Sequence, residues 1–570
     1  MEYDIEFRDV SFRYTGAQKD ALRGINLSVR PGEIILITGP AGSGKTTLCN
    51  CINGLVPHYH EGELSGQVIV RSYDTKRARI GGLASLVGMV FQDPDSQLVT
   101  SSVIDEVAFG PENLGVPRAE INQRVTEALA ATRLTGFEER EPHNLSGGEQ
   151  QACAIAATYS MHPDIYVMDE PLANLDPAGR HQVLQVLIDV VRQRQKTLII
   201  VEHSLEEVLP WVDRVLVLNG GQIVREGATE EVLAAGDIPG VFIRPDLVRL
   251  ASKFGLDPQV YSAEQFYSDL IARKSLGVIK VNDEQPRSSL GSTNPLIEFQ
   301  NVHYSYKGQN AALRGVNLTI HEGELVAILG RNGSGKTTLV RHIIGLLQPA
   351  QGRVMVSGRD VAATPTHELT QEIGFCFQNP NHQLVAFNVR DEMTFGLKAH
   401  NIDPAEFESR IHEALKLVNM SDALDAEIFD LGKGQKQRLA LASVLTLNPK
   451  ILVIDEPTTG QDPQMTREIF EIIRHLNEMG RTIVMVTHRI DFAAEYASRA
   501  IVMNRGTVAF DGPVMDLISD EEVMRANALD LPEVTKLALQ LRPHGVAVRI
   551  INVEQLEHYL QQLVETSHGD

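Results

Sequence analysis

A nine-residue, glycine-rich stretch that occurs twice constrains this chain more than any other feature. Residues 39–47 read GPAGSGKTT and residues 330–338 read GRNGSGKTT, and both fit the pattern G-x-x-x-x-G-K-[ST]. Each follows a four-residue apolar run, which predicts a buried parallel strand that leads into a tight turn. The glycines let successive N–H groups point at one anion, and a helix beginning at the lysine adds the positive end of its dipole. The sequence therefore predicts two sites for nucleoside triphosphates.

Each loop supplies its own candidate ligands. Lys45 and Lys336 would reach the β- and γ-phosphates, and Thr46 and Thr337 would place a hydroxyl on Mg²⁺. A chance glycine turn before a helix is the alternative, and two matched copies weigh against it. The other candidate nucleotide-binding residues of the loops are Gly39, Gly42, Ser43, Gly44, Thr47, Gly330, Gly333, Ser334, Gly335 and Thr338.

The remainder of the chain repeats with the same long period. Matched residues of the two halves lie 285–291 positions apart, and the flank at residues 7–33 recurs at residues 299–324. A period of this length indicates a duplicated domain rather than a solenoid. Within a half, apolar strands alternate with helical stretches, which predicts a parallel α/β core. Residues 5–10 and 27–30 alternate like antiparallel strands, and residues 101–158 predict a helical insertion with turns near Pro111, Gly136 and Pro142.

A second, shorter repeat closes each half. Residues 244–256 match residues 531–543, and Ser262 with Gln265, like Asn552 with Gln555, has the spacing of a capping box that starts a helix. These helices would either cap the core or contact a partner copy. Between the halves, residues 276–295 are predicted to form a linker, which when extended reaches about 65 Å and lets the halves face one another.

Composition excludes several classes of protein. No apolar run approaches the roughly 18 residues that span a bilayer, and the acidic N-terminus does not read as a signal peptide. Four scattered cysteines predict neither a disulfide framework nor a metal cluster, so a reducing cytoplasm is expected. A net charge of −22 argues against an extended nucleic-acid surface.

Two carboxylates follow a buried strand in each half. The segments IYVMDEP and ILVIDEP place Asp169 and Asp455 at the end of a strand, where they would hold Mg²⁺. Glu170 and Glu456 come next and would orient and polarise the attacking water. A solvated turn is the alternative, and the upstream phosphate loop disfavours it.

Three other repeated side chains are candidates for the same sites. Gln92 and Gln378 end a strand and would contact the metal or the attacking water and sense a partner, although a surface role is the common one. His203 and His488 follow another apolar strand and would contact the γ-phosphate, the alternative being a structural role. The aromatic candidates for stacking on a purine ring, with a core or surface role as the alternative, are Tyr14 and Tyr306.

The segment LSGGEQ at residues 145–150 opens an apolar helix, and Ser146, Gly147 and Gly148 would form a phosphate-binding helix N-terminus. Together with the preceding motifs it resembles the ATP-binding-cassette (ABC) ATPases over almost the whole chain. The resemblance implies ATP and Mg²⁺ as cofactors and two P-loop ABC ATPase domains of the α/β class. Each would have a RecA-like parallel-sheet core, an antiparallel β subdomain, a helical subdomain and a C-terminal helical extension. The implied domains are residues 1–240 and 296–520, with extensions at residues 241–275 and 521–570.

A narrower resemblance lies after the two glutamines. Residues 91–117 and 377–402, FQDPDSQLVTSSVIDEVAFGPENLGVP and FQNPNHQLVAFNVRDEMTFGLKAHNI, look like the ATPases of energy-coupling-factor importers for vitamins or transition-metal ions. That resemblance implies a place on the cytoplasmic face of the cell membrane. It also implies an integral membrane coupling protein, a small substrate-binding membrane protein and a head-to-tail pair of ATPase domains. Fusion makes that pairing intramolecular and raises its effective concentration.

The second half departs from the family pattern at residues 431–435, LGKGQ. Gly432 lacks the serine hydroxyl and Lys433 replaces the first glycine, whereas Gly434 is retained. Family geometry pairs the loop of one half with the signature of the other, so this variant would face the site of Lys45. A lost hydroxyl contact to phosphate costs about 1.5–3 kcal/mol, or roughly 10- to 150-fold in rate. We therefore expect the site of Lys336 to hydrolyse faster, the alternative being a fully active variant.

Three other functions compete with an importer motor. A tandem sugar-importer ATPase is disfavoured by the repeated FQ-[DN]-P-x-x-Q-L-V stretch. A soluble ATPase acting on ribosomes or DNA is disfavoured by the short linker and the acidic charge. A non-hydrolysing scaffold does not fit the paired glutamates and histidines.

Overall fold

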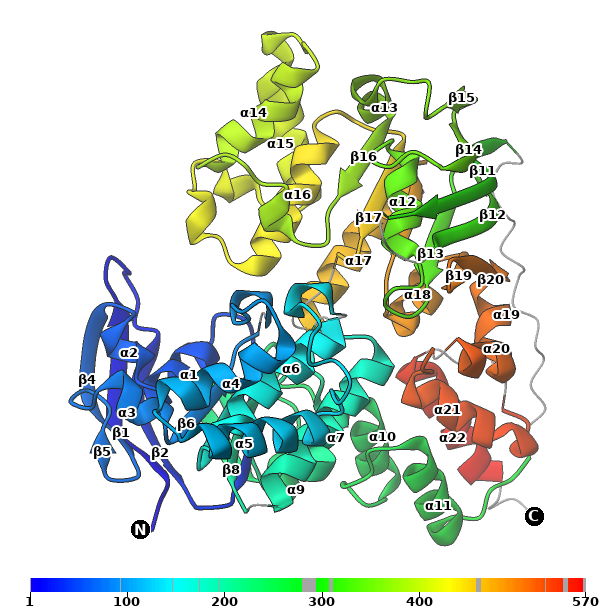
Figure 1. The fold of residues 1–570 in the computed structure, drawn as a ribbon. Helices are drawn as coiled ribbons and strands as arrows, with labels where there is room; N and C mark the ends of the chain where they lie inside the picture. The colour runs from blue at the N-terminus through cyan, green and yellow to red at the C-terminus, as the bar shows by residue number, and fades with distance from the viewer. Residues whose placement is uncertain are drawn as a thin grey trace. The chain divides into compact units, whose positions relative to one another are not determined.

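A computed structural model describes residues 2–92, 94–145, 147–173, 175–193, 195–278, 294–306, 311–457, 463–527, 529–546 and 552–566. The chain divides into two units, Met1–Arg273 and Lys274–Asp570, which share the order of their strands (Figure 1). Each is an α/β unit, as predicted. Most of the predicted linker, residues 279–293, lies outside the described residues, and Pro295 is not linker because it pairs with His321 in a strand. No helix in the described part of the chain is long and apolar enough to cross a membrane.

A six-stranded sheet forms the core of the first unit, in the order β10-β9-β3-β8-β7-β6, with only β10 antiparallel to its neighbour. Every residue of β3 is buried, because both faces of the sheet are covered. Ile34 and Leu36 pack into the core shared with the helices, and Ile35 and Ile37 into the core shared with the antiparallel sheet. The strands are β3 (Ile34–Thr38), β6 (Val87–Val90), β7 (Ile165–Asp169), β8 (Thr197–Val201), β9 (Arg214–Asn219) and β10 (Gln222–Ala228).

A second, antiparallel sheet of four strands has the order β2-β1-β4-β5, which confirms the antiparallel pairing predicted for residues 5–10 and 27–30. The alternation along β1 buries Ile5, Phe7, Val10 and Phe12 against the core sheet and α1. The elements are β1 (Ile5–Tyr14), β2 (Leu22–Val29), α1 (Lys45–Ile52), α2 (Leu55–His58), β4 (Gly62–Val70), β5 (Tyr73–Asp74) and α3 (Ile80–Ala84).

The helical insertion is α4 (Val103–Asn113), α5 (Arg118–Ala131) and α6 (Gly147–Ser160). The turn predicted near Pro111 follows at residues 114–115, and Pro111 itself lies inside α4. A proline cannot donate the hydrogen bond to the carbonyl four residues earlier. Here that carbonyl, Val107 O, accepts instead from the Ser160 hydroxyl at 2.7 Å, which lets α4 continue to its last turn.

The first unit ends with α7 (Pro177–Gln193), α8 (Leu205–Val208), α9 (Thr229–Ala234), α10 (Asp246–Phe254) and α11 (Ala263–Arg273). The predicted capping box is confirmed at α11, where Gln265 N donates to Ser262 Oγ and Ser262 N donates to Gln265 Oε1, both at 3.3 Å. In the second unit Gln555 N donates to Asn552 Oδ1 at 2.9 Å, just before the corresponding helix.

The second unit repeats this architecture, with sheets in the order β12-β11-β14-β15 and β16-β17-β18-β13-β19-β20. In Figure 1 its helices α14, α15 and α16 gather beside β16. Its strands are β11 (Pro295–Ser305), β12 (Ala311–His321), β13 (Leu325–Leu329), β14 (Gln351–Val356), β15 (Arg359–Asp360), β16 (Ile373–Cys376), β17 (Ile451–Asp455), β18 (Thr482–Val486), β19 (Arg499–Asn504) and β20 (Thr507–Pro513). Its helices are α12 (Lys336–Ile343), α13 (Thr366–Glu372), α14 (Val389–Ala399), α15 (Phe407–Leu417), α16 (Lys433–Leu445), α17 (Pro463–Glu478), α18 (Ile490–Tyr496), α19 (Val514–Ser519), α20 (Glu521–Ala526), α21 (Glu533–Gln540) and α22 (Val553–Thr566).

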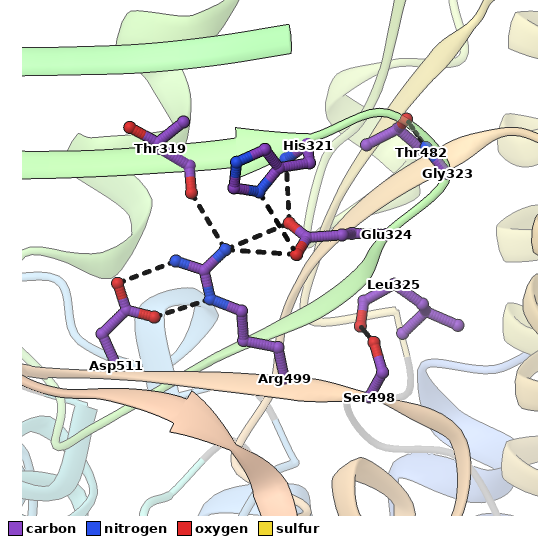
Figure 2. A network of polar contacts seen from close by, with 9 residues as sticks. All are labelled: Thr319, His321, Gly323, Glu324, Leu325, Thr482, Ser498, Arg499 and Asp511. Carbon is purple, nitrogen blue, oxygen red and sulfur yellow. Dashed lines mark hydrogen bonds and ion pairs between the residues drawn. The ribbon is translucent and has the colours of Figure 1, made fainter. Parts of the chain in front are cut away.

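A polar network built on Arg499 joins the two sheets of the second unit (Figure 2). Arg499, at the start of β19, donates to Thr319 O of β12 at 2.9 Å and to the buried Glu324 at 3.1 and 3.3 Å. Arg499 Nε and Nη2 donate to the two carboxylate oxygens of Asp511 on β20 at 2.6 and 2.8 Å. One guanidinium therefore fixes β12, β19, β20 and the start of β13 relative to one another, at the opposite end of β13 from the second phosphate loop.

Candidate active sites

Backbone angles and hydrogen bonds within the protein define the shape of each phosphate loop. Gly44 and Gly335 have left-handed φ angles of 102° and 105°, and α1 and α12 begin at the lysine that follows. Lys45 Nζ donates to Gly39 O at 2.9 Å, and Lys336 Nζ donates to Gly330 O at 2.8 Å. Each lysine is buried with its ammonium turned into its own loop, where phosphate oxygens would take the place of the carbonyls.

Replacing Gly330 by alanine is expected to destabilise the second unit more than replacing Gly333. A Cβ at Gly330 would collide with the Met503 carbonyl oxygen, whereas a Cβ at Gly333 would meet open space. Both glycines have positive φ angles, so strain is common to the two variants and the collision is not. Overpacking of this kind costs about 1–3 kcal/mol. Calorimetric unfolding without nucleotide should give the lower Tm for Gly330→Ala, and equal Tm values would contradict the expectation.

In each unit a glutamate directly follows the strand that ends in the aspartate. This glutamate contacts two of its predicted partners. In the first unit Gln92 Nε2 donates to Glu170 Oε2 at 2.5 Å, and His203 Nε2 lies 3.1 Å from Glu170 Oε1. Glu170 adopts a left-handed φ of 51°, which turns its side chain toward both partners. The strand ends therefore gather a glutamine, a glutamate and a histidine into one cluster.

The same cluster recurs in the second unit. Gln378 Nε2 donates to Glu456 Oε2 at 2.8 Å, and His488 Nε2 lies 2.6 Å from Glu456 Oε1. The φ of Glu456 is 48°. Such a carboxylate, oriented on both oxygens, is arranged to hold and polarise a water molecule.

The aspartates at the ends of β7 and β17 are buried and suit a divalent cation. Burial raises the pKa of Asp169 to about 6, and the charge of Glu170 adds to the rise. Burial and Glu456 likewise raise the pKa of Asp455 to about 6, although a hydrogen bond from Thr337 at 3.3 Å opposes them. A cation would favour the ionised form. Hydroxyl and carboxylate oxygens are the ligands that Mg²⁺ prefers.

Several buried oxygens at these positions make no hydrogen bond with the residues that the structure describes. They are Ser43 Oγ and Asp169 Oδ1 in the first unit and Ser334 Oγ in the second. A buried polar atom without a partner is costly, and phosphate oxygens or a metal ion would satisfy it. The residues present therefore fit a metal–nucleotide ligand.

The predicted base-stacking tyrosines lie against the phosphate loops. Tyr14 OH is 3.0 Å from Thr47 Oγ1, and Tyr306 OH is 3.3 Å from Thr338 Oγ1. The hydrogen bonds fix each half-buried ring beside its loop. Stacking on a purine stays a prediction.

In each unit the signature residues lie at the beginning of a helix of the insertion. Gly147 and Gly148 are the first residues of α6, and Ser146 lies outside the described residues. In the second unit Gly432 precedes α16, and a Cβ at Gly434 would lie 2.6 Å from the Met465 sulfur, so that side chain would have to move for a larger residue. Their predicted role in completing a site of the other half stays a prediction.

The family model for ABC transporters matches the chain twice, at residues 22–173 and 313–459. These two stretches contain both phosphate loops and both Asp-Glu pairs described above. The chain belongs to the ABC transporter family. It is accordingly an ATP-binding protein and an ATPase, with two ABC domains fused in tandem.

Relatives of this ABC protein share its tandem organisation over nearly the whole length. One from Caldanaerobacter subterraneus, named as an ABC transporter ATP-binding protein, is 38% identical over 94% of this chain and 96% of its own. One from Methanosarcina acetivorans, named in the same way, is 35% identical over 98% and 94%. Among solved structures, cbiO1 from Clostridium perfringens, part of the ABC transporter complex cbiONQ, is 34% identical. It covers 42% of this chain and 97% of its own, with a TM-score of 0.38.

Sequence reasoning missed several residues that shape the sites of this ABC protein. Glu202 is buried beside His203, and Glu106 and Glu392 are buried in the insertion. Gln97 and Gln383 accept from the backbone N–H of Phe91 and Phe377, at 3.0 and 3.2 Å, and so hold the strand ends before Gln92 and Gln378. The repetition of FQ-x-P-x-x-Q in both halves was the only signal that pointed to the last pair.

Proposed function

We propose that this ABC protein is the energy-coupling ATPase of a membrane importer of the energy-coupling-factor type, for a vitamin or a transition-metal ion. It would act on the cytoplasmic face of the cell membrane. There it would bind an integral membrane coupling protein that holds a small substrate-binding membrane protein. The observation that carries this proposal is an exposed apolar surface beside the catalytic glutamine, present in both units.

That surface follows the glutamine in each half. In the first unit Val99 is 64% exposed and Phe109 on α4 is also exposed. In the second unit Val385 is 64% exposed and Phe387 is 80% exposed, with Phe395 on α14 alongside in sequence. Exposed apolar side chains at matched positions of both units support a site of protein or membrane interaction.

A buried glutamate in each unit holds the loop after the glutamine in place. Glu106 Oε2 accepts from Val99 N and Thr100 N at 2.9 and 2.8 Å. Glu392 Oε2 accepts from Val385 N and Ala386 N, both at 2.9 Å. Since both carboxylates are buried, each loop is fixed rather than free to fold its apolar residues inward. A fixed apolar loop next to the catalytic glutamine supports a docked partner that senses the nucleotide state.

The chemistry proposed for each site follows from the clusters. Glu170 and Glu456 would polarise the attacking water, and His203 and His488 would contact the γ-phosphate. Mg²⁺ would be held by Thr46, Asp169 and Gln92 in the first site, and by Thr337, Asp455 and Gln378 in the second. The ion would neutralise phosphate charge.

We propose further that the two halves pair within the chain as a pseudo-dimer. ATP binding would close them and hydrolysis would reopen them, with the movement reaching the membrane partner through the loops after Gln92 and Gln378. Residues 146–148 would then complete the site of Lys336, and Gly432 and Gly434 the site of Lys45.

The test is a pull-down of the tagged full-length chain from detergent-solubilised membranes of its own host. We expect a polytopic coupling protein with a small hydrophobic companion, and loss of both when Val385 and Phe387 are replaced by serine. Tyr59→Ser is the matched control, because Tyr59 is equally exposed but lies outside the surface. Recovery of ribosomal or DNA-repair proteins from the soluble fraction, with no membrane partner, would overturn the transport function.

A further inference from the structure

A buried glutamate stands between the catalytic elements of the first unit. Glu202 directly follows β8, and its side chain is only 4% exposed. Its Oε1 accepts from Leu172 N at 2.8 Å, and its Oε2 accepts from His203 N at 3.2 Å. Glu202 therefore connects the segment after β8 to a residue that lies two positions beyond Glu170.

These contacts complete a closed arrangement around the catalytic glutamate. Glu170 N donates to Val201 O at 3.0 Å, and Glu170 Oε1 lies 3.1 Å from His203 Nε2. The Leu172–Glu202 bond makes a third link between the same two segments. Glu170 has a left-handed φ, a conformation that persists only where the surroundings over-determine it. The Glu202 link is one of the constraints that hold it.

Burying the carboxyl group of Glu202 costs free energy, which argues against a purely structural role for this residue. Burial raises its pKa to about 8, and the negative charges of Glu170 and Glu207 add to the rise. The N–H of Leu172 and the charge of Arg180 oppose it. Near neutral pH the carboxyl is therefore protonated and adds no second negative charge beside Glu170. An apolar residue would fill this place at lower cost but would not bond to Leu172.

The second unit provides an internal comparison. Thr487 stands at the position of Glu202 and is also buried. Its Oγ1 accepts from Arg489 N at 3.1 Å, a contact within one segment. A long acidic side chain at this position is thus particular to the first unit, in which Glu170 Oε1 lies 3.1 Å from His203 Nε2.

We propose that Glu202 is a positioning residue of the first ATP site, which sets Glu170 against His203 by tying together the segments that carry them. The proposal rests on the catalytic role assigned to Glu170. Because Glu202 acts through Glu170 and His203, its loss should slow hydrolysis without weakening nucleotide binding. Deprotonating it should disturb the same geometry by placing a like charge beside Glu170.

The test uses the full-length chain carrying Glu456→Gln, in which the remaining ATP hydrolysis comes from the first site. In that background Glu202→Ala should lower kcat about 10- to 100-fold, the size of effect that misplacement of a catalytic group produces. KM should stay within about twofold, because Glu202 is expected to leave the ground-state complex unchanged. Thr487→Ala, measured with Glu170→Gln, should change kcat by less than about threefold, since the hydrogen bond that Thr487 accepts among the described residues lies within one segment.

A pH profile separates positioning from a general loss of stability. Glu202→Gln keeps the shape and an acceptor oxygen, so it should fold and hydrolyse at the parent rate at pH 7. From pH 7 to pH 9 the parent should lose activity relative to Glu202→Gln, because only the parent gains a charge there. Unchanged kcat in a folded Glu202→Ala, or parallel pH profiles, would overturn the proposal. If Glu170→Gln itself leaves first-site hydrolysis unchanged, the catalytic assignment fails instead.

Discussion

ATP hydrolysis by the full-length chain is expected to fall about 10²–10⁴-fold when Glu170 and Glu456 are both replaced by glutamine. Glutamine keeps the size of each side chain and its contacts with Gln92 or Gln378, but it is a far weaker base toward the attacking water. ATP binding should remain, because neither glutamate belongs to a phosphate loop. Steady-state phosphate release and equilibrium binding of a fluorescent ATP analogue measure the two quantities separately.

The single replacements should be unequal. If the LGKGQ variant slows the site of Lys45 by roughly 10- to 150-fold, Glu456→Gln removes most of the activity and Glu170→Gln removes little. The comparison is internally controlled, because each glutamate has the same glutamine and histidine partners within 3.1 Å. Equal losses in the two variants would remove the basis for the asymmetry.

Replacing Arg499 by alanine is expected to lower the free energy of unfolding of the second unit by about 3–5 kcal/mol. The reason is the buried carboxylate that stays behind: Glu324 would lose its two contacts with Arg499 and keep its charge in the interior. Urea unfolding followed by an optical signal from the second unit measures the change.

Two further variants sharpen this expectation. Arg474→Ala removes an arginine that is exposed and paired with Glu471 and Glu478 on α17, so its cost should be much smaller than that of Arg499→Ala. Adding Glu324→Gln to Arg499→Ala should restore part of the loss, because the unpaired charge disappears. A cost for Arg499→Ala no larger than that for Arg474→Ala would show that the network in Figure 2 contributes little.

Features encoded in short, repeated segments could be predicted from the sequence. The phosphate loops, the buried strands before them and the cap of α11 depend on neighbouring residues, and the structure has all of them. Contacts that join distant segments could not be predicted. The place of Pro111 inside α4 is an example, because the Ser160 hydroxyl that accommodates it lies 49 residues further along the chain.

The residues of the site also divide into those that a local sequence pattern predicts and those that depend on contacts between distant segments. Asp169 and Glu170 follow from an apolar strand that ends in two acids, a local pattern. Glu202 gave no such signal, since a glutamate before a histidine usually lies on the surface. Its importance depends on Leu172, which reaches it only because β7 and β8 are neighbours in the sheet.

The left-handed backbone of Glu170 and Glu456 also bears on how this chain would respond to selection. A Cβ atom is disfavoured in that conformation, whereas glycine adopts it freely and asparagine tolerates it through its local hydrogen bonds. Libraries screened only for heat resistance should therefore enrich glycine or asparagine at these two positions. The most heat-resistant variants would be those that have lost ATP hydrolysis. A screen for a more stable form of this ATPase therefore has to measure turnover as well as thermal stability.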